Sequence, residues 1–560
     1  MHTSTDASIT ERIKTYTAKG WWTDTTLSDA FAEAAEAHGD RTALVDQPNR
    51  EGLDGGTPKR WSWSDLKEEV SAYARTLHQL GVRRGDTVVV QLPNIAEFVV
   101  LYLALARLGA IISPVPVQYG RHELTMIGQA LSPRLFIGIT RFHGHDLTAA
   151  VGASGFSQCV WFGPESPAGQ PLLADLVDAV RSESKTPAID SNANDVMTIC
   201  WTSGTTGTPK GVPRTHNQWF AIAPATYEGA AMREGDVLLN PFPFVNMASI
   251  GGMLINWLRC QGTLVLHHPL ELPVFLTQIK QESVTFTIAP PALLNMLLKN
   301  EALMSQFDLS SLRCIASGSA PLSPWMVQGF ADTYNIGVVN LFGSNEGCSL
   351  VSGVEDMPDA TLRASYFPRF GVDGIEWKAS VSKMIKTRLR DLETGKLITD
   401  RNQPGELEIT GATMFDHYLG DSASNPDVFT EDGYFRTGDL FEITGDDEPP
   451  RFYHFVGRCK DIIIRGGANI SPDEIDTLLA AHPKLAEAAT VGYADDDLGE
   501  RVCVFVVAKP DETVSLDDVT GFLREQGLAV FKLPERLETI DVLPRNALGK
   551  VVRGELRAKL

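Results

Sequence analysis

Basic residues and internal repeats are both scarce in this chain of 560 residues. Lys and Arg number 49 against 70 Asp and Glu, which gives a formal net charge of -21. An acidic chain without a Lys/Arg block repels a phosphate backbone, so we expect no nucleic acid partner. No segment repeats with a period of about 20 to 50 residues, which argues against a solenoid or a propeller.

Cysteines and histidines do not form the clusters that disulfides or metals need. The seven cysteines are scattered, odd in number and without a Cys-x-x-Cys pair. They indicate neither a disulfide framework nor a thiolate zinc site, and they suit a reducing cytoplasm. Two close histidine pairs, His143 with His145 and His267 with His268, lack a further ligand at zinc spacing, so we expect no metal there.

Long hydrophobic runs are missing as well. The longest, Phe98 to Ala106, ends at Arg107 and is shorter than the roughly 20 residues of a membrane span. The polar, charged stretch from Met1 to Lys14 is unlike a secretory signal. We therefore expect a cytoplasmic protein without membrane insertion, and a buried helix at 98–106.

The composition that is present suits an α/β protein with a sizeable core. Hydrophobic residues make up 43% of the chain, and at about 150 residues per domain the length accommodates roughly two to four domains. Short β-branched runs alternate with longer helical ones, which predicts mixed sheets covered by helices. We expect strands at 87–92, 196–201, 263–268 and 284–289, and helices at 96–108 and 292–298.

The end of the chain is predicted to form a small α+β unit of its own. A Gly-rich segment, 457–467, precedes a helix start at which Ser471 is the cap, Pro472 suits the first helical position and Glu474 completes a capping box. A strand at 501–509 and a helix at 516–526 follow. We divide the chain into an N-terminal domain, 1–459, and a C-terminal domain, 460–560.

The most informative segment is T-S-G-T-T-G-T-P-K-G at 202–211, directly after a predicted strand. Glycines let backbone N–H groups approach an anion, hydroxyls add donors, and a lysine adds a mobile positive charge. The spacing is not that of the P-loop, because Pro209 stands where a glycine is needed. A flexible surface linker is the alternative, but linkers seldom follow a buried strand and end in Pro-Lys-Gly. We predict a phosphate-binding loop.

Five ordered motifs give the chain a resemblance to the adenylate-forming superfamily: acyl-CoA synthetases, aryl-acid:AMP ligases, peptide-synthetase adenylation domains and luciferases. They are the loop at 202–211, F-G-S-N-E-G at 342–347, Y-F-R-T-G-D-L at 434–440, G-R-C-K-D-I-I-I-R-G-G at 457–467 and P-R-N-A-L-G-K at 544–550. The resemblance covers nearly the whole chain. It implies a large α/β N-terminal domain of mixed sheets with a small barrel-like section, and a small, mobile α+β C-terminal domain.

The resemblance implies ATP and Mg²⁺ as cofactors. Asp439 takes the role of the ribose ligand, Phe342 that of the ring stacked on adenine, and Glu346 that of the magnesium ligand, for which a hard carboxylate is suited. Taken alone, Asp439 is an ordinary turn former and Glu346 a solvated surface acid. The residues assigned to ATP or AMP are Thr202, Ser203, Gly204, Thr205, Thr206, Gly207, Lys210, Gly318, Phe342, Gly343, Ser344, Asn345, Asp439 and Arg458.

Catalysis is assigned to Lys550 together with Glu346. Attack of a carboxylate on the α-phosphate builds negative charge, which a lysine can neutralise. In the superfamily such a lysine enters the site for adenylation and leaves when the small domain rotates. Lys460 matches the hinge of that rotation, and Gly466 and Gly467 match glycines that line a pantetheine tunnel; plain turns are the alternative.

The acid pocket is expected to contain Asn246, Met247, Ser317, Gly343 and Cys348. Relatives often carry a His near Val245, and its absence leaves the acid open. Asn246 either reads a substituent ortho to the carboxylate of an aromatic acid or satisfies the loop backbone. Cys348 has no neighbouring His in sequence, so we treat it as pocket lining.

Two branches of the superfamily compete for the substrate. Segments 20–22, 212–217 and 522–534 resemble 2,3-dihydroxybenzoate:AMP ligases, whereas 92–108 and 498–507 resemble medium-chain and cyclohexanecarboxylate:CoA ligases. Their difference lies in the pocket, so the sequence leaves both open.

The resemblance therefore predicts an AMP-forming acid–thiol ligase. A small carboxylic acid and ATP give an acyl- or aryl-adenylate and pyrophosphate, and the thiol of CoA, or of phosphopantetheine on an acyl or aryl carrier protein, then attacks. Alternatives on the same fold are adenylate formation without CoA transfer, a luciferase-like oxygenase, and activation of another oxyanion such as nitrite for aryl-amine diazotisation. A non-catalytic nucleotide-binding protein is disfavoured, because it would be expected to lose Lys550 or Glu346.

Overall fold

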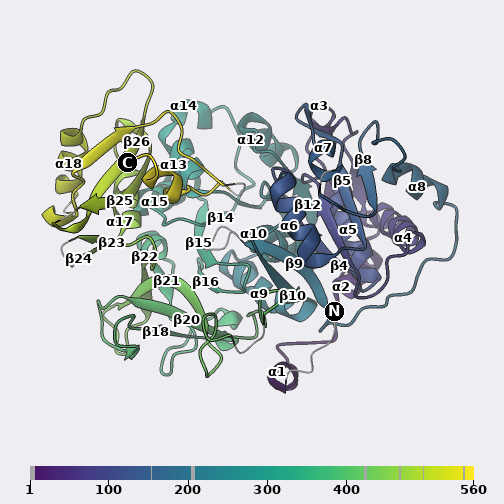
Figure 1. Cartoon of the computed structure of the whole chain (residues 1–560), viewed down its shortest axis with the longest axis horizontal. Coiled ribbons are helices and arrows are strands. Elements are labelled where there is room, and N and C mark those ends of the chain that lie inside the picture. Colours follow the sequence, from purple (N-terminus) through teal and green to yellow (C-terminus); the bar gives the residue numbers. More distant parts are fainter. Residues whose placement is uncertain are drawn as a thin grey trace.

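The computed structural model describes residues 7–152, 154–202, 209–421, 425–465, 468–495, 497–526, 528–546 and 549–560. Two large sheets with intervening helices form the blue and teal side of the molecule, and a third sheet and the C-terminal unit, green and yellow, form the other (Figure 1). None of the helices in the described part of the chain combines the length and apolarity needed to cross a membrane.

The larger sheet among the described residues has eight strands. Its six inner strands are parallel, and an antiparallel strand closes each edge. The order is β16 (Ser349–Ser352), β15 (Gly337–Gly343), β14 (Cys314–Gly318), β13 (Phe286–Ile288), β11 (Val237–Asn240), β12 (Thr263–Leu266), β1 (Thr42–Val45) and β2 (Arg60–Ser62).

The second sheet has six strands, and only β10 runs against the others in the described part of the chain. The order is β10 (Lys210–Thr215), β9 (Val196–Thr202), β4 (Ile111–Pro114), β3 (Thr87–Gln91), β5 (Leu135–Ile139) and β8 (Cys159–Phe162). All four strands predicted from apolar runs exist, as β3, β9, β12 and β13. The prediction of mixed sheets is confirmed.

Successive residues of the parallel strands enter different cores, because their side chains point to opposite faces. Val88 of β3 and Leu238 of β11 meet in a central core, whereas Val89 and Leu239 face outer cores. Helices α2 (Leu27–His38), α4 (Trp63–Gln79), α5 (Ala96–Arg107), α9 (His216–Gly229) and α11 (Ile255–Cys260) fill the central layer. Helices α12 (Leu272–Gln281), α13 (Pro291–Lys299) and α15 (Pro324–Tyr334) cover the outer face of the larger sheet, and α6 (Arg121–Leu131) covers that of the smaller.

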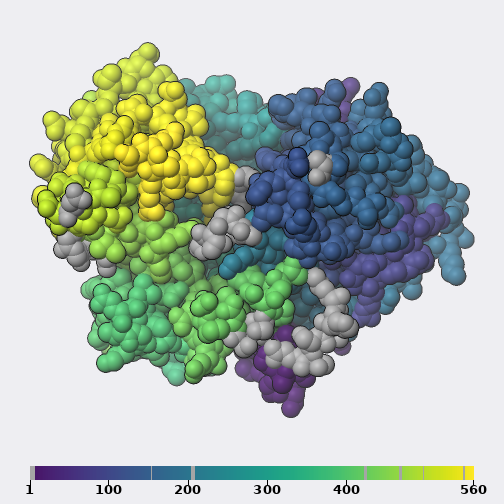
Figure 2. Space-filling view, viewed as in Figure 1, coloured from purple at the N-terminus to yellow at the C-terminus, as the bar shows by residue number. Residues whose placement is uncertain are grey.

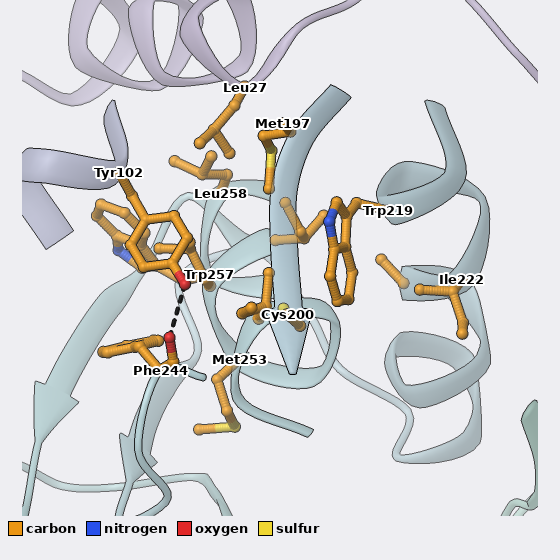
Figure 3. Packing of buried hydrophobic residues seen from close by; sticks show 14 of the residues in the cluster. Leu27, Tyr102, Met197, Cys200, Trp219, Ile222, Phe244, Met253, Trp257 and Leu258 are labelled. Carbon is orange, nitrogen blue, oxygen red and sulfur yellow. Dashed lines mark hydrogen bonds between the residues drawn. The ribbon is translucent and has the colours of Figure 1, made fainter. Parts of the chain in front are cut away.

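Helix α5 lies in the middle of these layers and is buried from Ala96 to Ala106, as predicted for 98–106. Its Tyr102 hydroxyl donates a hydrogen bond of 2.6 Å to the backbone oxygen of Phe244 (Figure 3). Trp219 of α9 lies on the opposite side of β9, near Cys200. The loop after β11, which carries Asn246 of the predicted acid pocket, is therefore anchored from inside the core.

The third sheet is antiparallel and corresponds to the barrel-like section expected from the sequence. Its order is β17 (Tyr366–Pro368), β22 (Phe452–Arg458), β21 (Phe435–Thr444), β20 (Gly405–Gly411), β18 (Ile385–Arg390) and β19 (Leu397–Ile398). Strands β21 and β22 bring the ends of two predicted motifs into register, because Asp439 pairs with Arg458.

The C-terminal unit has a core of its own around β25 (Leu485–Asp495) and β26 (Gly499–Ala508), with α17 (Pro472–Leu479) and α18 (Leu516–Glu525) packed on them. Strands β23 (Ile463–Arg465), β24 (Ala468–Ile470) and β27 (Arg536–Thr539) complete its sheet.

The start of α17 differs in part from the prediction. Ser471 caps the helix as expected, because its hydroxyl accepts from the Glu474 N–H at 3.2 Å. Glu474, however, binds the Lys532 ammonium at 2.7 Å and does not return to the cap. The predicted capping box is therefore wrong in its second half.

Candidate active site

Strands β9 and β10, on either side of the predicted phosphate loop in the sequence, pair as antiparallel neighbours. Thr202 and Lys210 pair with each other across the two strands, so they mark the two ends of the loop. The predicted ligands Ser203, Gly204, Thr205, Thr206 and Gly207 lie outside the described residues. The Lys210 ammonium lies 4.7 Å from the centre of the Tyr418 ring, which directs the base of the loop toward the Glu346 region.

Glu346 lies in the tight turn between β15 and β16. The Gly347 N–H donates to the Ser344 carbonyl at 3.0 Å, and the Ser344 N–H donates to the Cys348 carbonyl at 3.2 Å. Gly347 has a φ of +103°, and a Cβ there would lie 2.1 Å from the Thr413 carbonyl oxygen, so only glycine fits. Glu346 is buried at 6% exposure, not a solvated surface acid.

Glu346 has a hydrogen-bond partner, Tyr418, that the sequence did not predict. The Tyr418 hydroxyl donates to Glu346 Oε1 at 2.8 Å. Burial and the Glu346 charge both raise the pKa of Tyr418, so the phenol stays protonated and remains a donor. The only signal in the sequence was a tyrosine within a polar segment, which is too common to single out.

Asn345 and Ser344 flank Glu346 and differ in how they are satisfied. Asn345 Oδ1 accepts from the Met247 N–H at 2.8 Å, so its amide nitrogen is the group left to donate. The Ser344 hydroxyl is buried and has no hydrogen-bond partner among the described residues. A buried hydroxyl without a partner is costly, and a polar ligand would satisfy it.

Asp439 lies in strand β21 and not in the turn for which its residue type and neighbours are typical. Gly438 has a φ of +72°, and the register between β21 and β22 shifts between Leu440 and Phe441. The strand is therefore irregular at the point where its sequence is typical of a turn. The Asp439 carboxylate lies 3.6 Å from Arg458 Nε. Burial raises the pKa of Asp439 to about 6, although Arg458 and Lys550 oppose the rise.

Lys550 comes to the same place from the C-terminal unit. Its side chain is half-buried, and burial and Arg458 lower its pKa while Asp439 and Glu346 raise it. A turn fixes its backbone: the Lys550 N–H donates to Asn546 Oδ1 at 3.0 Å. The structure therefore brings together Lys550, Asp439, Arg458 and Glu346, which are far apart in the sequence.

Phe342 and Gly318 lie on neighbouring strands at the edge of this charged group. The Phe342 ring is half-buried and meets the edge of Phe441 with a centroid distance of 5.0 Å. Gly318 pairs with Leu341, and a Cβ at Gly318 would lie 2.2 Å from the Leu341 oxygen. A side chain at Gly318 would push this strand pair apart.

The predicted acid pocket is built from satisfied, uncharged groups. Asn246 caps the short helix α10 (Met247–Ser249), with its Oδ1 accepting from the Ser249 N–H at 3.2 Å. The Ser317 hydroxyl is buried and donates to the Ala289 carbonyl at 2.8 Å. The backbone role for Asn246 is therefore present, and its amide nitrogen is not used by the cap.

Gly343 separates Met247 from Cys348 in this pocket. A Cβ at Gly343 would lie 2.1 Å from Met247 Cε and 2.9 Å from the Cys348 carbonyl oxygen. Cys348 is 1% exposed, and burial raises the pKa of its thiol far above the usual range. A thiol held protonated lines a pocket and is a poor nucleophile.

Lys460 follows β22 in a turn, and its side chain is exposed. The turn is held by the Asp461 N–H, which donates to the Arg458 carbonyl at 3.0 Å, and by the Cys459 N–H, which donates to Gly438 at 3.0 Å. The predicted tunnel glycines, Gly466 and Gly467, lie outside the described residues.

Comparison with known families identifies the chain. The family described as AMP-binding enzyme matches residues 31–419, and the one described as AMP-binding enzyme C-terminal domain matches residues 474–550. The protein belongs to the AMP-binding enzyme family. The resemblance to adenylate-forming enzymes is confirmed.

An aryl-acid–AMP ligase, of the first expected branch, and a 4-coumarate-CoA ligase are both similar to the chain over most of its length. The 2,3-dihydroxybenzoate-AMP ligase of Bacillus subtilis is 28% identical, covering 98% of this chain and 96% of the relative. The 4-coumarate-CoA ligase 1 of Narcissus pseudonarcissus is 27% identical, covering 91% of this chain and 90% of the relative. The solved structure of the anthranilate CoA ligase AuaEII with anthranoyl-AMP shares the fold, with a TM-score of 0.81 at 21% identity over 96% of this chain and 97% of that one.

Proposed function

We propose that the protein uses ATP to activate a carboxylic acid as its adenylate, releases pyrophosphate, and then transfers the acyl or aryl group to a thiol. The observation that carries this proposal is the position of Lys550, which the C-terminal unit places among Asp439, Arg458 and Glu346. A half-buried cation near two carboxylates can serve a polyanionic ligand.

Each charged group has a separate task in the adenylation step. Asp439 accepts hydrogen bonds from the ribose hydroxyls, and with a pKa near 6 it is ionised at neutral pH. Lys550 neutralises charge as the acid oxygen attacks the α-phosphorus and the bond to pyrophosphate breaks. The buried Ser344 hydroxyl and the free amide of Asn345 provide donors beside them.

Magnesium fits the donor set as an ion that arrives with ATP. Among the described residues, no group of three or more His, Cys, Asp or Glu side chains is arranged to hold a metal ion. Mg²⁺ is usually held by one or two carboxylates, with phosphate oxygens and water as its other ligands. Glu346, oriented by Tyr418, is the carboxylate we assign to it. When bound, the ion would neutralise phosphate charge.

The thiol step follows rotation of the C-terminal domain, residues 460–560, about Lys460. Attack of the thiol sulfur on the carbonyl carbon breaks the bond to AMP, so the AMP leaves with the bridging oxygen. We assign the thiol path to the Gly466–Gly467 segment, and CoA or a carrier-protein phosphopantetheine as the acceptor. The relative named as a 4-coumarate-CoA ligase supports CoA as the acceptor.

We further propose an aromatic acid, with Asn246 as a reader of its ortho substituent. The helix cap uses only Asn246 Oδ1. The Nδ2 group can therefore donate a hydrogen bond to the oxygen of an ortho hydroxyl group or to the nitrogen of an ortho amino group. Met247, Gly343 and Cys348 leave a wall that is uncharged. The 2,3-dihydroxybenzoate-AMP ligase relative supports this choice.

The test is pyrophosphate release with a panel of acids, with and without CoA. The panel holds benzoates with ortho hydroxyl or amino groups, cycloalkane carboxylates and fatty acids. Release that depends on an ortho-substituted benzoate, with an aryl thioester seen by mass spectrometry, is the expected result. Release only with aliphatic acids would overturn the aromatic assignment, and no release with any acid would overturn acid activation.

A further inference from the structure

The Glu346 turn rests on an irregular stretch of backbone that we call the support segment, residues 411–418. Three bonds join the two. The Phe415 N–H donates to the Glu346 carbonyl at 2.8 Å, the Thr413 hydroxyl donates to the Gly347 carbonyl at 2.9 Å, and the Tyr418 hydroxyl donates to the Glu346 carboxylate. The position of Glu346 therefore depends on the support segment.

Beyond Gly411, the last residue of β20, the support segment is not held by a sheet ladder. Five successive backbone carbonyls, 411 to 415, each accept a hydrogen bond from a side chain elsewhere in the sequence. Arg12 donates to Gly411 at 3.3 Å, to Met414 at 2.7 Å and to Phe415 at 3.3 Å. Trp22 donates to Ala412 at 3.0 Å, and Arg214 donates to Thr413 at 2.7 Å.

The two arginines approach from different elements. Arg12 belongs to α1 (Ala7–Ala18), which lies at the lower edge of the molecule, apart from the layered body (Figure 1; purple in Figure 2). Arg12 also pairs with Asp416, whose other oxygen accepts from Gln218 at 3.0 Å. No residue of α1 is itself buried, but its Ile13 and Tyr16 pack against the small core cluster that contains Trp22.

Arg214 is fully buried, and within the described residues it has no carboxylate at salt-bridge distance. It donates to the carbonyls of Thr413, of Gln218 at 2.8 Å and of Asn345 at 3.4 Å. Its guanidinium also lies 4.1 Å from the centre of the Trp219 ring. A buried cation without an ion-pair partner is expensive, which indicates a role beyond packing.

We infer that Arg12 and Arg214 are positioning residues for Glu346: they hold the support segment from two sides and so fix the carboxylate that faces the nucleotide's metal ion. Neither contacts the reacting atoms. Through Arg12, helix α1 thereby helps to position a residue of the active site. Assigning the metal to Glu346 rests on the proposed function, whereas the grip on the support segment does not.

The experiment compares the wild type with Arg12→Ala, Arg12→Lys and Lys14→Ala. A fourth variant, Arg214→Lys, tests the buried arginine. Lys14 is an exposed cation on the same helix, so Lys14→Ala matches the charge change without touching the support segment. Arg12 is partly exposed, so its variants are expected to fold even where changes at Arg214 do not.

Two readouts are measured on the whole protein. In the first, hydrogen exchange of peptides covering 411–418 and 344–347 without ligand should be about tenfold faster in Arg12→Ala, because charge-assisted hydrogen bonds are lost. In the second, the Mg²⁺ concentration that gives half-maximal ATP binding should rise about tenfold, while AMP binding without metal changes less than about twofold. Arg12→Lys should recover part of both effects, and Arg214→Lys should shift both in the same direction.

Unchanged exchange in Arg12→Ala, or an effect of equal size in Lys14→Ala, would overturn the inference. Equal weakening of ATP and AMP binding would also overturn it, because that is the result of a general loss of structure. If the wild type binds no ATP at any Mg²⁺ concentration, the proposed function fails, and the exchange measurement still decides whether the arginines hold the Glu346 turn.

Discussion

The two ends of the candidate site are built on different principles. At the nucleotide end, Asp439 and Lys550 are charged groups whose pKa values are shifted by burial, and Arg458 lies beside them. At the acid end, Asn246 and Ser317 are neutral and already bonded to backbone. The nucleotide end can therefore bind a charged ligand through electrostatic interactions. The acid end selects its acid by shape and by the unused amide nitrogen of Asn246.

The largest expected effect comes from a substitution that impairs only the nucleotide end. Lys550→Ala should lower adenylate formation by about a thousandfold or more, because the charge that builds on the α-phosphate loses its cation. Thioester formation from supplied adenylate should stay within about threefold of wild type, since the acid end and thiol path are untouched. Rapid-quench assays of each half-reaction measure this, with exposed Lys559→Ala as the control. Equal loss of both half-reactions would contradict the division.

Asp439→Asn should separate binding from stability. Nucleotide affinity, measured by calorimetry with AMP, should fall about a hundredfold, because a charged acceptor of two hydroxyls is lost. Stability should rise by about 1 to 2 kcal/mol at pH 7 to 8, because the buried carboxylate no longer has to ionise. Exposed Asp446→Asn is the matched control.

The pH dependence of that gain follows from the direction of the shift. The pKa of Asp439 is raised from 3.8 to about 6 in the folded protein, so ionisation costs stability fully above pH 6. The cost disappears as the pH falls toward 3.8, where the folded and unfolded states are both protonated. Melting curves of the two proteins should therefore converge at low pH. A constant gap from pH 4 to pH 8 would show that Asp439 is not the titrating group.

Asn246 tests the acid end with two variants. Asn246→Ala removes both the cap and the amide donors, and should cost about 1 kcal/mol of stability. Asn246→Asp keeps the cap oxygen, so it should retain stability. The ratio of kcat/KM for an ortho-hydroxy or ortho-amino benzoate to kcat/KM for plain benzoate should fall about tenfold. Nucleotide affinity should not change in either. Retained discrimination in Asn246→Asp would leave only the backbone role.

The smallest expected effect is that of Tyr418→Phe. The ring and its contact with Lys210 remain, and only one hydrogen bond to Glu346 is removed. We expect about a threefold to tenfold rise in the Mg²⁺ concentration needed for half-maximal adenylation. A titration of magnesium at fixed ATP measures it, and an unchanged curve would remove Tyr418 from the site.

Local sequence predicted the elements well where one face or both faces are apolar. The strand at 196–201 and the helix at 96–108 are found as β9 and α5 with ends shifted by one residue. Residues with two possible local roles were harder. Asp439 follows a glycine and an aromatic pair typical of a turn, and only pairing with Arg458 keeps it in a strand. Glu474 is at the right spacing to bond the backbone N–H of the cap residue Ser471, but its carboxylate forms an ion pair with Lys532 instead.

The candidate site divides in the same way. Its nucleotide residues stand in contiguous motifs, so the sequence predicted them together. The residues that hold Glu346 in place could not be predicted, because they lie far from their partners in the sequence. Arg12 binds backbone carbonyls such as that of Met414, 402 residues away, and Tyr418 binds a single carboxylate 72 residues away. For Asn246 the cap and the substrate role use different atoms of one side chain, and composition does not distinguish them.

The most direct test of acid activation is to follow the oxygens of the acid. The carboxylate is labelled with ¹⁸O, a full turnover is run with ATP and the thiol, and the AMP is examined by mass spectrometry. Attack of the acid on the α-phosphorus followed by thiol attack on the carbonyl predicts AMP carrying one ¹⁸O per turnover. Unlabelled AMP, or label in inorganic phosphate, would contradict adenylate formation.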